Sequence, residues 1–224
     1  MRQSAGTGEN DLFYFERLAR EAGHMRIAGI DEVGRGPLAG PVVAAAVVLP
    51  DTNVTLALAD SKVLTARRRE HLAAELRNLA GVQIGIGTCS ASEVDALNVL
   101  RASVEAMRKA VAALQPHPSF ALVDGLPIHE FPVAAKFIVK GDGRSASIAA
   151  ASIIAKVHRD ALMVAMDADY PGYGFAQHKG YATALHLQAL QRLGPTPEHR
   201  HSYAPVWKAA GNGGQQLDLG LFSE

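Results

Sequence analysis

The sequence is poor in cysteine and has no apolar run long enough to cross a membrane. Cys89 is the single cysteine of 224 residues, so no disulfide can form within the chain, as is typical of the reducing cytosol. The longest apolar run, 38–49, is too short to span a bilayer. The first residues lack the basic start and apolar centre of a signal peptide. We therefore expect a soluble, cytoplasmic protein with no membrane partner.

The chain also lacks an excess of charge of either sign, with 22 basic and 22 acidic residues. Neutrality argues against a generic polyanion binder with a strongly basic surface, but it does not exclude a basic patch balanced by acid elsewhere. The basic run 67–69 is most simply a solvated helix face that could also contact a duplex backbone. With 48% hydrophobic residues, the chain can bury a sizeable core, which excludes wholesale disorder.

Apolar segments bordered by glycine, proline or charge predict an α/β fold. The predicted strands are 26–31, 42–49, 82–88, 120–124 and 136–140. The predicted helices are 11–22, one within 61–80, 92–114 with Ser92 as its N-cap, 145–168 and 183–193. Together they predict a mixed five-stranded sheet flanked by helices, and a glycine-rich linker follows Lys208.

Four acidic residues follow three of the predicted strands, each close to a glycine. Asp31 and Glu32 follow RIAGI, Asp124 follows FALV, and Asp142 follows KFIVKG. In open α/β sheets sites form beyond the strand ends, so these acids could converge there. Converging carboxylates repel each other unless a cation neutralises them, and an all-oxygen ligand set suits Mg²⁺ or Mn²⁺.

The simplest alternative is that each Asp-Gly pair is a turn, which we would favour for any one of them taken alone. Four such acids at predicted strand ends favour a shared site. Adjacent strand residues point to opposite faces, so Asp31 and Glu32 can share a site only if the chain bends between them, which Gly34 and Gly36 would permit. Such a cluster suits two-metal phosphodiester hydrolysis, with the substrate still open.

Two other site classes fit the sequence poorly. Nine histidines accompany the single cysteine, but the HRH at 199–201, His178 and His186 lack a matching Cys/His pattern, and no HExxH occurs, which argues against zinc. His178 and His199 could instead lie near a substrate. The GxG at 34–36 is followed by Pro37 and a strand-like run, which contradicts a dinucleotide-binding turn.

Long segments of the chain carry a family resemblance. They are GIDEVGRGPLAGPVVAAAVVL, DSK at 60–62, SEVDALNVLRAS, LVDG, VKGDGRSASIAAASIIAKVHRD, GYGFAQHKGYATALH and GPTPEHRHSY. In this order, over about residues 24–207, they closely resemble ribonuclease HII, the type 2 ribonuclease H family. The resemblance implies a ribonuclease H-like sheet with a C-terminal helical extension. It also implies a division into an N-terminal helix with a loose start (1–23), a catalytic domain (24–208) and a flexible tail (209–224).

The resemblance assigns roles to the four acids. Asp31, Glu32, Asp124 and Asp142 fall on the family's metal-binding residues, which implies two Mn²⁺ or Mg²⁺ ions with substrate bound. In our interpretation Asp31 and Asp124 hold the ion that activates water. Asp31, Glu32 and Asp142 then hold the ion that faces the leaving group.

Substrate-binding residues follow from the same resemblance. Gly34-Arg35-Gly36 falls on the family's GRG motif, which senses the ribose 2′-hydroxyl largely through backbone groups. Tyr181 falls on the tyrosine that packs against the next deoxyribose, although taken alone it would be an ordinary half-buried tyrosine. Four further residues lie in matching segments and are expected to hold phosphates: Lys62, Asn98, Arg144 and Ser145.

Two departures from the family pattern bear on those phosphate contacts. Val63 stands where the family often has a second lysine, and Gly143-Arg144 stands where Ala-Lys is common. Neither departure removes a predicted metal ligand.

The implied activity is endonucleolytic cleavage 5′ of a ribonucleotide in RNA–DNA hybrids and in duplex DNA, leaving 3′-hydroxyl and 5′-phosphate ends. The implied role is removal of misincorporated ribonucleotides, with a monomer as the default state. Another nuclease or a resolvase would share the acids without needing the GRG motif and Tyr181. A non-catalytic nucleic-acid-binding module would have no use for four acids that repel phosphate.

The end of the chain resembles the peptide with which bacterial proteins bind the sliding clamp. The pattern is carried by Gln216, Leu217, Leu219, Leu221 and Phe222, after the glycine-rich linker. Short apolar anchors on a tether suit docking into a partner's pocket. The alternative is a tail that folds back onto its own domain.

Overall fold

The computed structural model describes residues 11–50 and 64–212. Lys62 and the tail residues 216–222 therefore lie outside the described residues. Strands β1 (Ile27–Val33), β2 (Val42–Val48), β3 (Gln83–Cys89), β4 (Phe120–Asp124) and β5 (Ala135–Ile138) form one sheet in the order β3-β2-β1-β4-β5. The pairs β1–β2 and β2–β3 are antiparallel, whereas β1–β4 and β4–β5 are parallel. The predicted mixed five-stranded sheet is confirmed.

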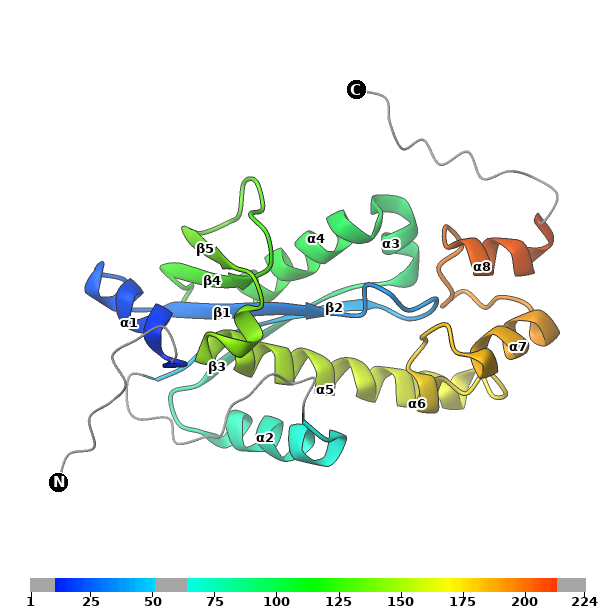
Figure 1. Ribbon diagram of the computed structural model, residues 1–224, viewed down its shortest axis with the longest axis horizontal. Coiled ribbons are helices and arrows are strands. Elements are labelled where there is room, and N and C mark those ends of the chain that lie inside the picture. The colour runs from blue at the N-terminus through cyan, green and yellow to red at the C-terminus, as the bar shows by residue number, and fades with distance from the viewer. Residues whose placement is uncertain (1–10, 51–63, 213–224) are drawn as a thin grey trace.

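Helices cover both faces of this sheet (Figure 1). Helices α3 (Ala91–Leu97) and α4 (Val99–Ala112) lie on one face, and α5 (Ala146–Asp169) crosses the other with α2 (Ala66–Asn78) packed against it. Strand β2, between β3 and β1, is buried on both sides. Its even-numbered residues pack toward α4 and its odd-numbered residues toward α5, as the two-residue period of a strand requires.

Helix α5 packs against β1 at Gly29. A Cβ atom at this position would lie 2.0 Å from the carbonyl carbon of Ser147 and 2.3 Å from the nitrogen of Ile148. Only a glycine leaves room for this approach of helix to strand. The contact fixes the start of α5 beside the strand that carries Asp31 and Glu32.

The remaining helices lie at the two ends of the sheet. Helix α1 (Tyr14–Glu21) packs near the start of β1, while α6 (Phe175–His178), α7 (Ala184–Leu193), α8 (Ala204–Trp207) and η2 (Lys208–Asn212) lie beyond the other end (Figure 1). The predicted helices 145–168 and 183–193 are confirmed as α5 and α7. No helix among the described residues is long and apolar enough to cross a membrane.

Three predicted boundaries were wrong. The N-cap of the helix after β3 is Ser90, not Ser92, because Ser90 and Glu93 form a capping box. The predicted helix 92–114 is two helices, because Asn98 adopts a φ of 65° that breaks the helix, and its side chain caps α4. Strand β5 ends at Ile138, and the 3₁₀ turn η1 (Gly141–Gly143) follows, so Asp142 lies in a turn.

Candidate active site

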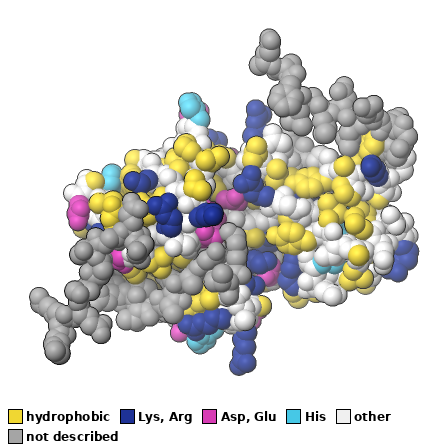
Figure 2. Space-filling model, viewed as in Figure 1, with side chains coloured by type: hydrophobic (Ala, Val, Ile, Leu, Met, Phe, Trp, Pro, Cys, Tyr) yellow, Lys and Arg dark blue, Asp and Glu magenta, His cyan; other side chains and the backbone are white. Residues whose placement is uncertain are grey.

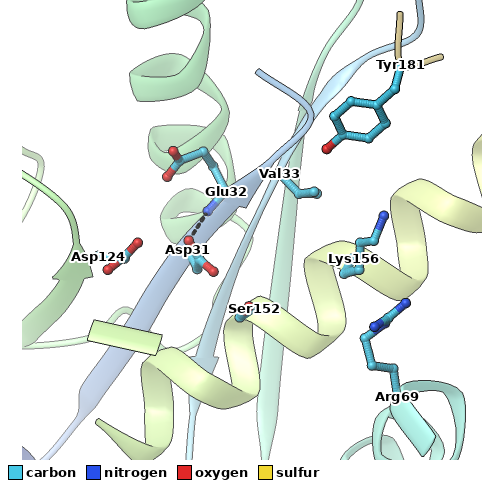
Figure 3. Close-up of a pocket in the computed structure, with 8 residues that line it drawn as sticks. All are labelled: Asp31, Glu32, Val33, Arg69, Asp124, Ser152, Lys156 and Tyr181. Atoms are coloured by element: carbon cyan, nitrogen blue, oxygen red, sulfur yellow. Dashed lines mark hydrogen bonds between the residues drawn. The ribbon is translucent and has the colours of Figure 1, made fainter. Parts of the chain in front are cut away.

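Three of the four predicted acids meet where β1 and β4 end. The last paired residues of these parallel strands are Ile30 and Val123, and Asp31 and Asp124 are the next residue of each strand. Because the strands are parallel, their carboxyl ends lie at the same edge of the sheet. Asp31, Glu32 and Asp124 line one pocket (Figure 3).

No bend is needed between Asp31 and Glu32, contrary to the expectation from their adjacency. Strand β1 continues to Val33, still paired with β2, whereas its pairing with β4 stops at Ile30. The β4 side of β1 is therefore open beside both acids. Figure 3 shows the two carboxylates on opposite sides of the ribbon, both bordering the same pocket.

Each acid of the pair has a polar partner in the protein. The carboxylate of Asp31 accepts the Glu32 amide at 2.8 Å and a hydrogen bond from the Ser152 side chain, and only 7% of the residue is exposed. The carboxylate of Glu32 pairs with the Arg35 guanidinium at 3.2 Å. Ser152, on α5, was not predicted as a site residue.

Asp31 and Glu32 are held in an environment that opposes their ionisation. Burial raises the pKa of Asp31 well above its ordinary value, and the charges of Glu32 and Asp124 raise it further. Burial also raises the pKa of Glu32, although Arg35 opposes this shift. The negative charges of such a cluster repel each other, and a bound cation would offset this repulsion.

The fourth predicted acid, Asp142, lies next to this group but does not line the pocket. It is buried, with 3% exposed, in η1. The amide of Gly141, one residue earlier, donates to Asp124 at 2.6 Å. The structure therefore places Asp142 in the turn whose Gly141 amide contacts Asp124.

Basic and aromatic side chains form the other side of the pocket. Arg69 of α2, Lys156 of α5 and Tyr181 line it together with the acids (Figure 3). Lys156 pairs with Asp160 at 2.8 Å. On the face seen in Figure 2, Lys and Arg side chains gather on either side of central acidic side chains. The basic run 67–69, first interpreted as a solvated helix face, thus contributes Arg69 to the site.

The segment 34–36 follows β1 directly and lies close to Tyr181. Gly34 has a φ of +95°, which favours glycine, and a Cβ atom there would lie 2.3 Å from the Arg159 Nε. A Cβ atom on Gly36 would lie 3.9 Å from the Tyr181 ring. The side chain of Arg35 is exposed and turned toward Glu32.

Two buried arginines that the sequence did not single out bind backbone carbonyls near this segment, and one of them binds the segment itself. Arg200 and Arg159 are both fully buried. Arg200 donates to the carbonyl oxygens of Gly34 and Arg35 at 2.5 and 2.9 Å. Arg159 donates to those of Pro41, Lys179 and Ala39 at 2.9, 3.0 and 3.2 Å. Both lie within segments that matched the family, but their positions alone gave no sign of this role.

The described phosphate-contact candidates lie outside the pocket. The exposed Asn98 caps α4 by accepting from Leu100 and Arg101. Arg144 is exposed, 5.2 Å from the ring centroid of Phe15. Ser145 is fully buried, caps α5 and donates its hydroxyl hydrogen bond to Glu16 at 2.7 Å. Its hydroxyl therefore does not face a substrate as expected.

Buried histidines join α6, α7 and the segment before α8. The Nε2 atoms of His186 and His199 are 3.1 Å apart, and the His186 Nδ1 lies 2.9 Å from the carbonyl oxygen of Tyr181. His178 stacks on His186, with ring centroids 4.3 Å apart. These rings contact backbone and one another, so they support the position of Tyr181.

The donor chemistry of the pocket fits a hard divalent cation. Asp31, Glu32 and Asp124 offer oxygen atoms alone, which is the preference of Mg²⁺ and Mn²⁺. Within residues 11–50 and 64–212, no three Asp, Glu, His or Cys side chains form a ready-made metal site as they stand. Glu32 is turned to Arg35 and Asp124 to Gly141, so both would have to rotate toward an ion.

Comparisons with known proteins agree with the fold and show the family. The family model described as Ribonuclease HII matches residues 28–209. A Ribonuclease HII of Geobacillus kaustophilus is 54% identical over 196 residues, which are 88% of this chain and 75% of that protein. The ribonuclease H2 structure from Pyrococcus horikoshii superposes with a TM-score of 0.72 at 25% identity, covering 84% of this chain and 98% of that one. A structure of the PCNA:RNase HII complex from Archaeoglobus fulgidus superposes with a TM-score of 0.66 at 26% identity, covering 84% of this chain and 91% of that one.

Proposed function

The chain belongs to the ribonuclease HII family and is therefore a ribonuclease H endonuclease, and we propose that it cuts 5′ of ribonucleotides in RNA–DNA hybrids and in duplex DNA. The proposal includes single ribonucleotides embedded in DNA and a role in their removal. The products carry 3′-hydroxyl and 5′-phosphate ends.

One observation carries the proposal. Asp31, Glu32 and Asp124 border a single pocket at the carboxyl ends of two parallel strands, and Tyr181 with the segment 34–36 lies across from them. The acids provide for hydrolysis of a phosphodiester, and the glycine-rich backbone with the tyrosine provides for recognition of a sugar. A metal-binding site without the recognition elements would fit many nucleases.

The family is metal-dependent, and we assign two divalent cations, Mn²⁺ or Mg²⁺, to the acids. When bound, the cations activate a water and stabilise the leaving oxygen. Asp31 and Asp124 would hold the ion that activates water, and Asp31, Glu32 and Asp142 would hold the ion that stabilises the leaving group. In this hydrolysis the water oxygen would bond to phosphorus as the bond to the 3′-oxygen breaks, and the proton that the water loses would balance the proton that the 3′-oxygen gains.

Recognition of the substrate falls to the opposite side of the pocket. The backbone of Gly34, Arg35 and Gly36 approaches the ribose closely enough to sense its 2′-hydroxyl, and the ring of Tyr181, 42% exposed, packs against the next deoxyribose. Arg69 and Lys156 hold the phosphates on either side of the scissile bond without reading the bases.

The tail is proposed to bind the sliding clamp. Its support is the pattern of Gln216, Leu217, Leu219, Leu221 and Phe222, together with the similarity to an archaeal RNase HII whose structure is a complex with PCNA. Binding would place the nuclease on newly replicated DNA. A pull-down of the clamp by the full chain, lost on deletion of 213–224, is the expected result. Equal pull-down by both forms would contradict the assignment.

The nuclease proposal is tested with duplex DNA that carries one ribonucleotide. We expect the protein to cut it with Mg²⁺ or Mn²⁺ and to leave an all-DNA duplex of the same sequence intact. Asp124→Asn should lower the cleavage rate at least about 100-fold, because it removes charge that holds a cation. The matched control is Asp169→Asn, an exposed acid at the end of α5, which should cut normally. Cleavage of the all-DNA duplex, or full activity of Asp124→Asn, would contradict the proposal.

A further inference from the structure

The guanidinium of Arg200 is fully buried and is bound almost entirely by backbone carbonyl groups. Its Nη2 donates to Gly34 at 2.5 Å and to Gly40 at 2.9 Å, its Nη1 donates to Arg35 at 2.9 Å, and its Nε donates to Gly40 at 3.1 Å. No carboxylate within the described ranges 11–50 and 64–212 forms an ion pair with it. A buried cation without a directly paired carboxylate is costly, so these carbonyl dipoles, together with the more distant charge of Asp95, compensate its charge.

Tyr203 reinforces the same contacts. Its hydroxyl donates to the Arg35 carbonyl at 2.7 Å and accepts from the Arg200 Nη1 at 3.2 Å. The guanidinium also lies 5.3 Å from the centroid of the Tyr203 ring. The carbonyl of Arg35 is therefore held by two donors, and that of Gly34 by one.

This arrangement determines where two backbone amides point. A trans peptide is planar, and its N–H points opposite to its C=O. Since the carbonyls of Gly34 and Arg35 point inward to Arg200, the amides of Arg35 and Gly36 point outward. Both residues are exposed, and no acceptor for either amide occurs among the described residues. Two successive N–H donors therefore face solvent beside Tyr181.

From this arrangement we infer that Arg200 and Tyr203 are positioning residues for ribose recognition, which aim the amides of Arg35 and Gly36 at the 2′-oxygen of a bound ribonucleotide. The inference rests on the proposed function and deepens it. A hydrogen bond from a cation to a peptide carbonyl polarises the peptide unit, so its N–H becomes a stronger donor. Lysine cannot replace this arginine, because a compact ammonium does not offer a planar fork to several carbonyls at once.

The test compares binding of two duplexes by the same protein. In single-turnover cleavage, the half-saturating enzyme concentration reports binding of a duplex with one ribonucleotide. The inhibition constant of an all-DNA duplex of the same sequence reports binding without the 2′-oxygen. We expect Arg200→Lys to reduce the preference for the ribonucleotide about tenfold, and Tyr203→Phe about two- to fivefold, with binding of the all-DNA duplex unchanged.

A matched variant separates positioning from loss of stability. Leu114→Ala removes a buried side chain at the end of α4, away from the pocket, and should destabilise the protein while leaving the ratio of the two constants unchanged. Each half-saturating concentration is expressed per folded protein, with the folded fraction of each variant measured by circular dichroism, so a smaller folded fraction does not alter the ratio.

Three results would overturn the inference. Tyr203→Phe and Arg200→Lys could both keep the wild-type ratio. Both constants could weaken together, which would mean that the amides hold a phosphate common to the two duplexes. Leu114→Ala could lose the preference as strongly as Arg200→Lys. Failure of the proposed function is a different result, since the wild-type protein would then not cut the ribonucleotide duplex at all.

Discussion

Lowering the pH from 7 to 4 should destabilise the protein through His199, which is fully buried between Thr196 and His186. The Thr196 amide donates to the His199 Nδ1 at 3.0 Å, so the neutral ring carries its proton on Nε2. That proton points at the His186 Nε2, 3.1 Å away, and the His186 Nδ1–H donates to the carbonyl of Tyr181. A second proton on His199 would sit on Nδ1 and face the Thr196 amide. The ring would then lose the hydrogen bond that Nδ1 accepts from this amide.

The magnitude follows from the pKa of His199. Burial, with the charge of His186 as a smaller cause, lowers this pKa from 6.5 to about 4. As the pH falls below 6.5 the unfolded chain takes up this proton before the folded protein does, so the free energy of unfolding decreases until about pH 4. At 1.36 kcal/mol per unit of pKa, the loss is about 3 kcal/mol. The pKa of His186 is also lowered, chiefly by burial, and adds a loss of the same sign.

Urea unfolding at several pH values measures this effect. The variant His199→Gln keeps an amide near His186 but cannot titrate. The difference in unfolding free energy between the wild type and this variant should shrink by about 3 kcal/mol from pH 7 to pH 4. His129→Gln replaces an exposed histidine and serves as the control for the His-to-Gln replacement itself. A difference for His199→Gln that does not change with pH would refute the reasoning.

Other residues give shorter predictions. Gly29→Ala should lower the free energy of unfolding in urea by about 2–3 kcal/mol or more, since its Cβ would overlap the backbone of α5; unchanged stability would contradict the packing. Gly36→Ala should leave stability unchanged but weaken binding of the ribonucleotide duplex, because its Cβ has room yet occupies the space beside Tyr181. Glu16→Gln should lower stability by about 1–3 kcal/mol in thermal melting, because the Glu16 Oε1 accepts three buried hydrogen bonds from Ser145 and Ser147; an unaltered melting temperature would show that these bonds contribute nothing.

The strands and the acids that follow them could be predicted because their signals are local. The alternation in β3 and the apolar runs of β1 and β2 specify buried strands without knowledge of their partners. Asp31 and Asp124 come directly after the last paired residues of parallel strands, and for that reason the pattern of acids at strand ends predicted their proximity.

Boundaries that depend on competing local patterns were harder to predict. Ser90 with Glu93, and Ser92 with Asp95, both match the spacing of a capping box, and only the first forms one. The break at Asn98 needs a positive φ that the sequence does not reveal. The same applies to Lys140, with a φ of 56°, where β5 gives way to the turn that carries Asp142.

The arginines behind the site could not be predicted from the sequence. Arg200 binds the carbonyl of Gly34, 166 residues away along the chain, and Arg159 binds that of Pro41, 118 residues away. Every residue type has a backbone carbonyl, so the sequence does not show which carbonyls accept from a buried arginine. An acidic partner, in contrast, would be visible in the sequence as an Asp or a Glu. Sequence reasoning therefore found the acids that line the pocket and missed the arginines that hold the backbone in place.

The central claim, hydrolysis by metal-assisted attack of water 5′ of a ribonucleotide, is tested most directly by mapping the cut at nucleotide resolution. The substrate is duplex DNA with one ribonucleotide, labelled at either end in separate reactions. We expect a single cut 5′ of the ribonucleotide, with a 3′-hydroxyl on one fragment and a 5′-phosphate on the other. A cut 3′ of the ribonucleotide that leaves a 2′,3′-cyclic phosphate would mean that the 2′-hydroxyl is the nucleophile, and it would contradict the account.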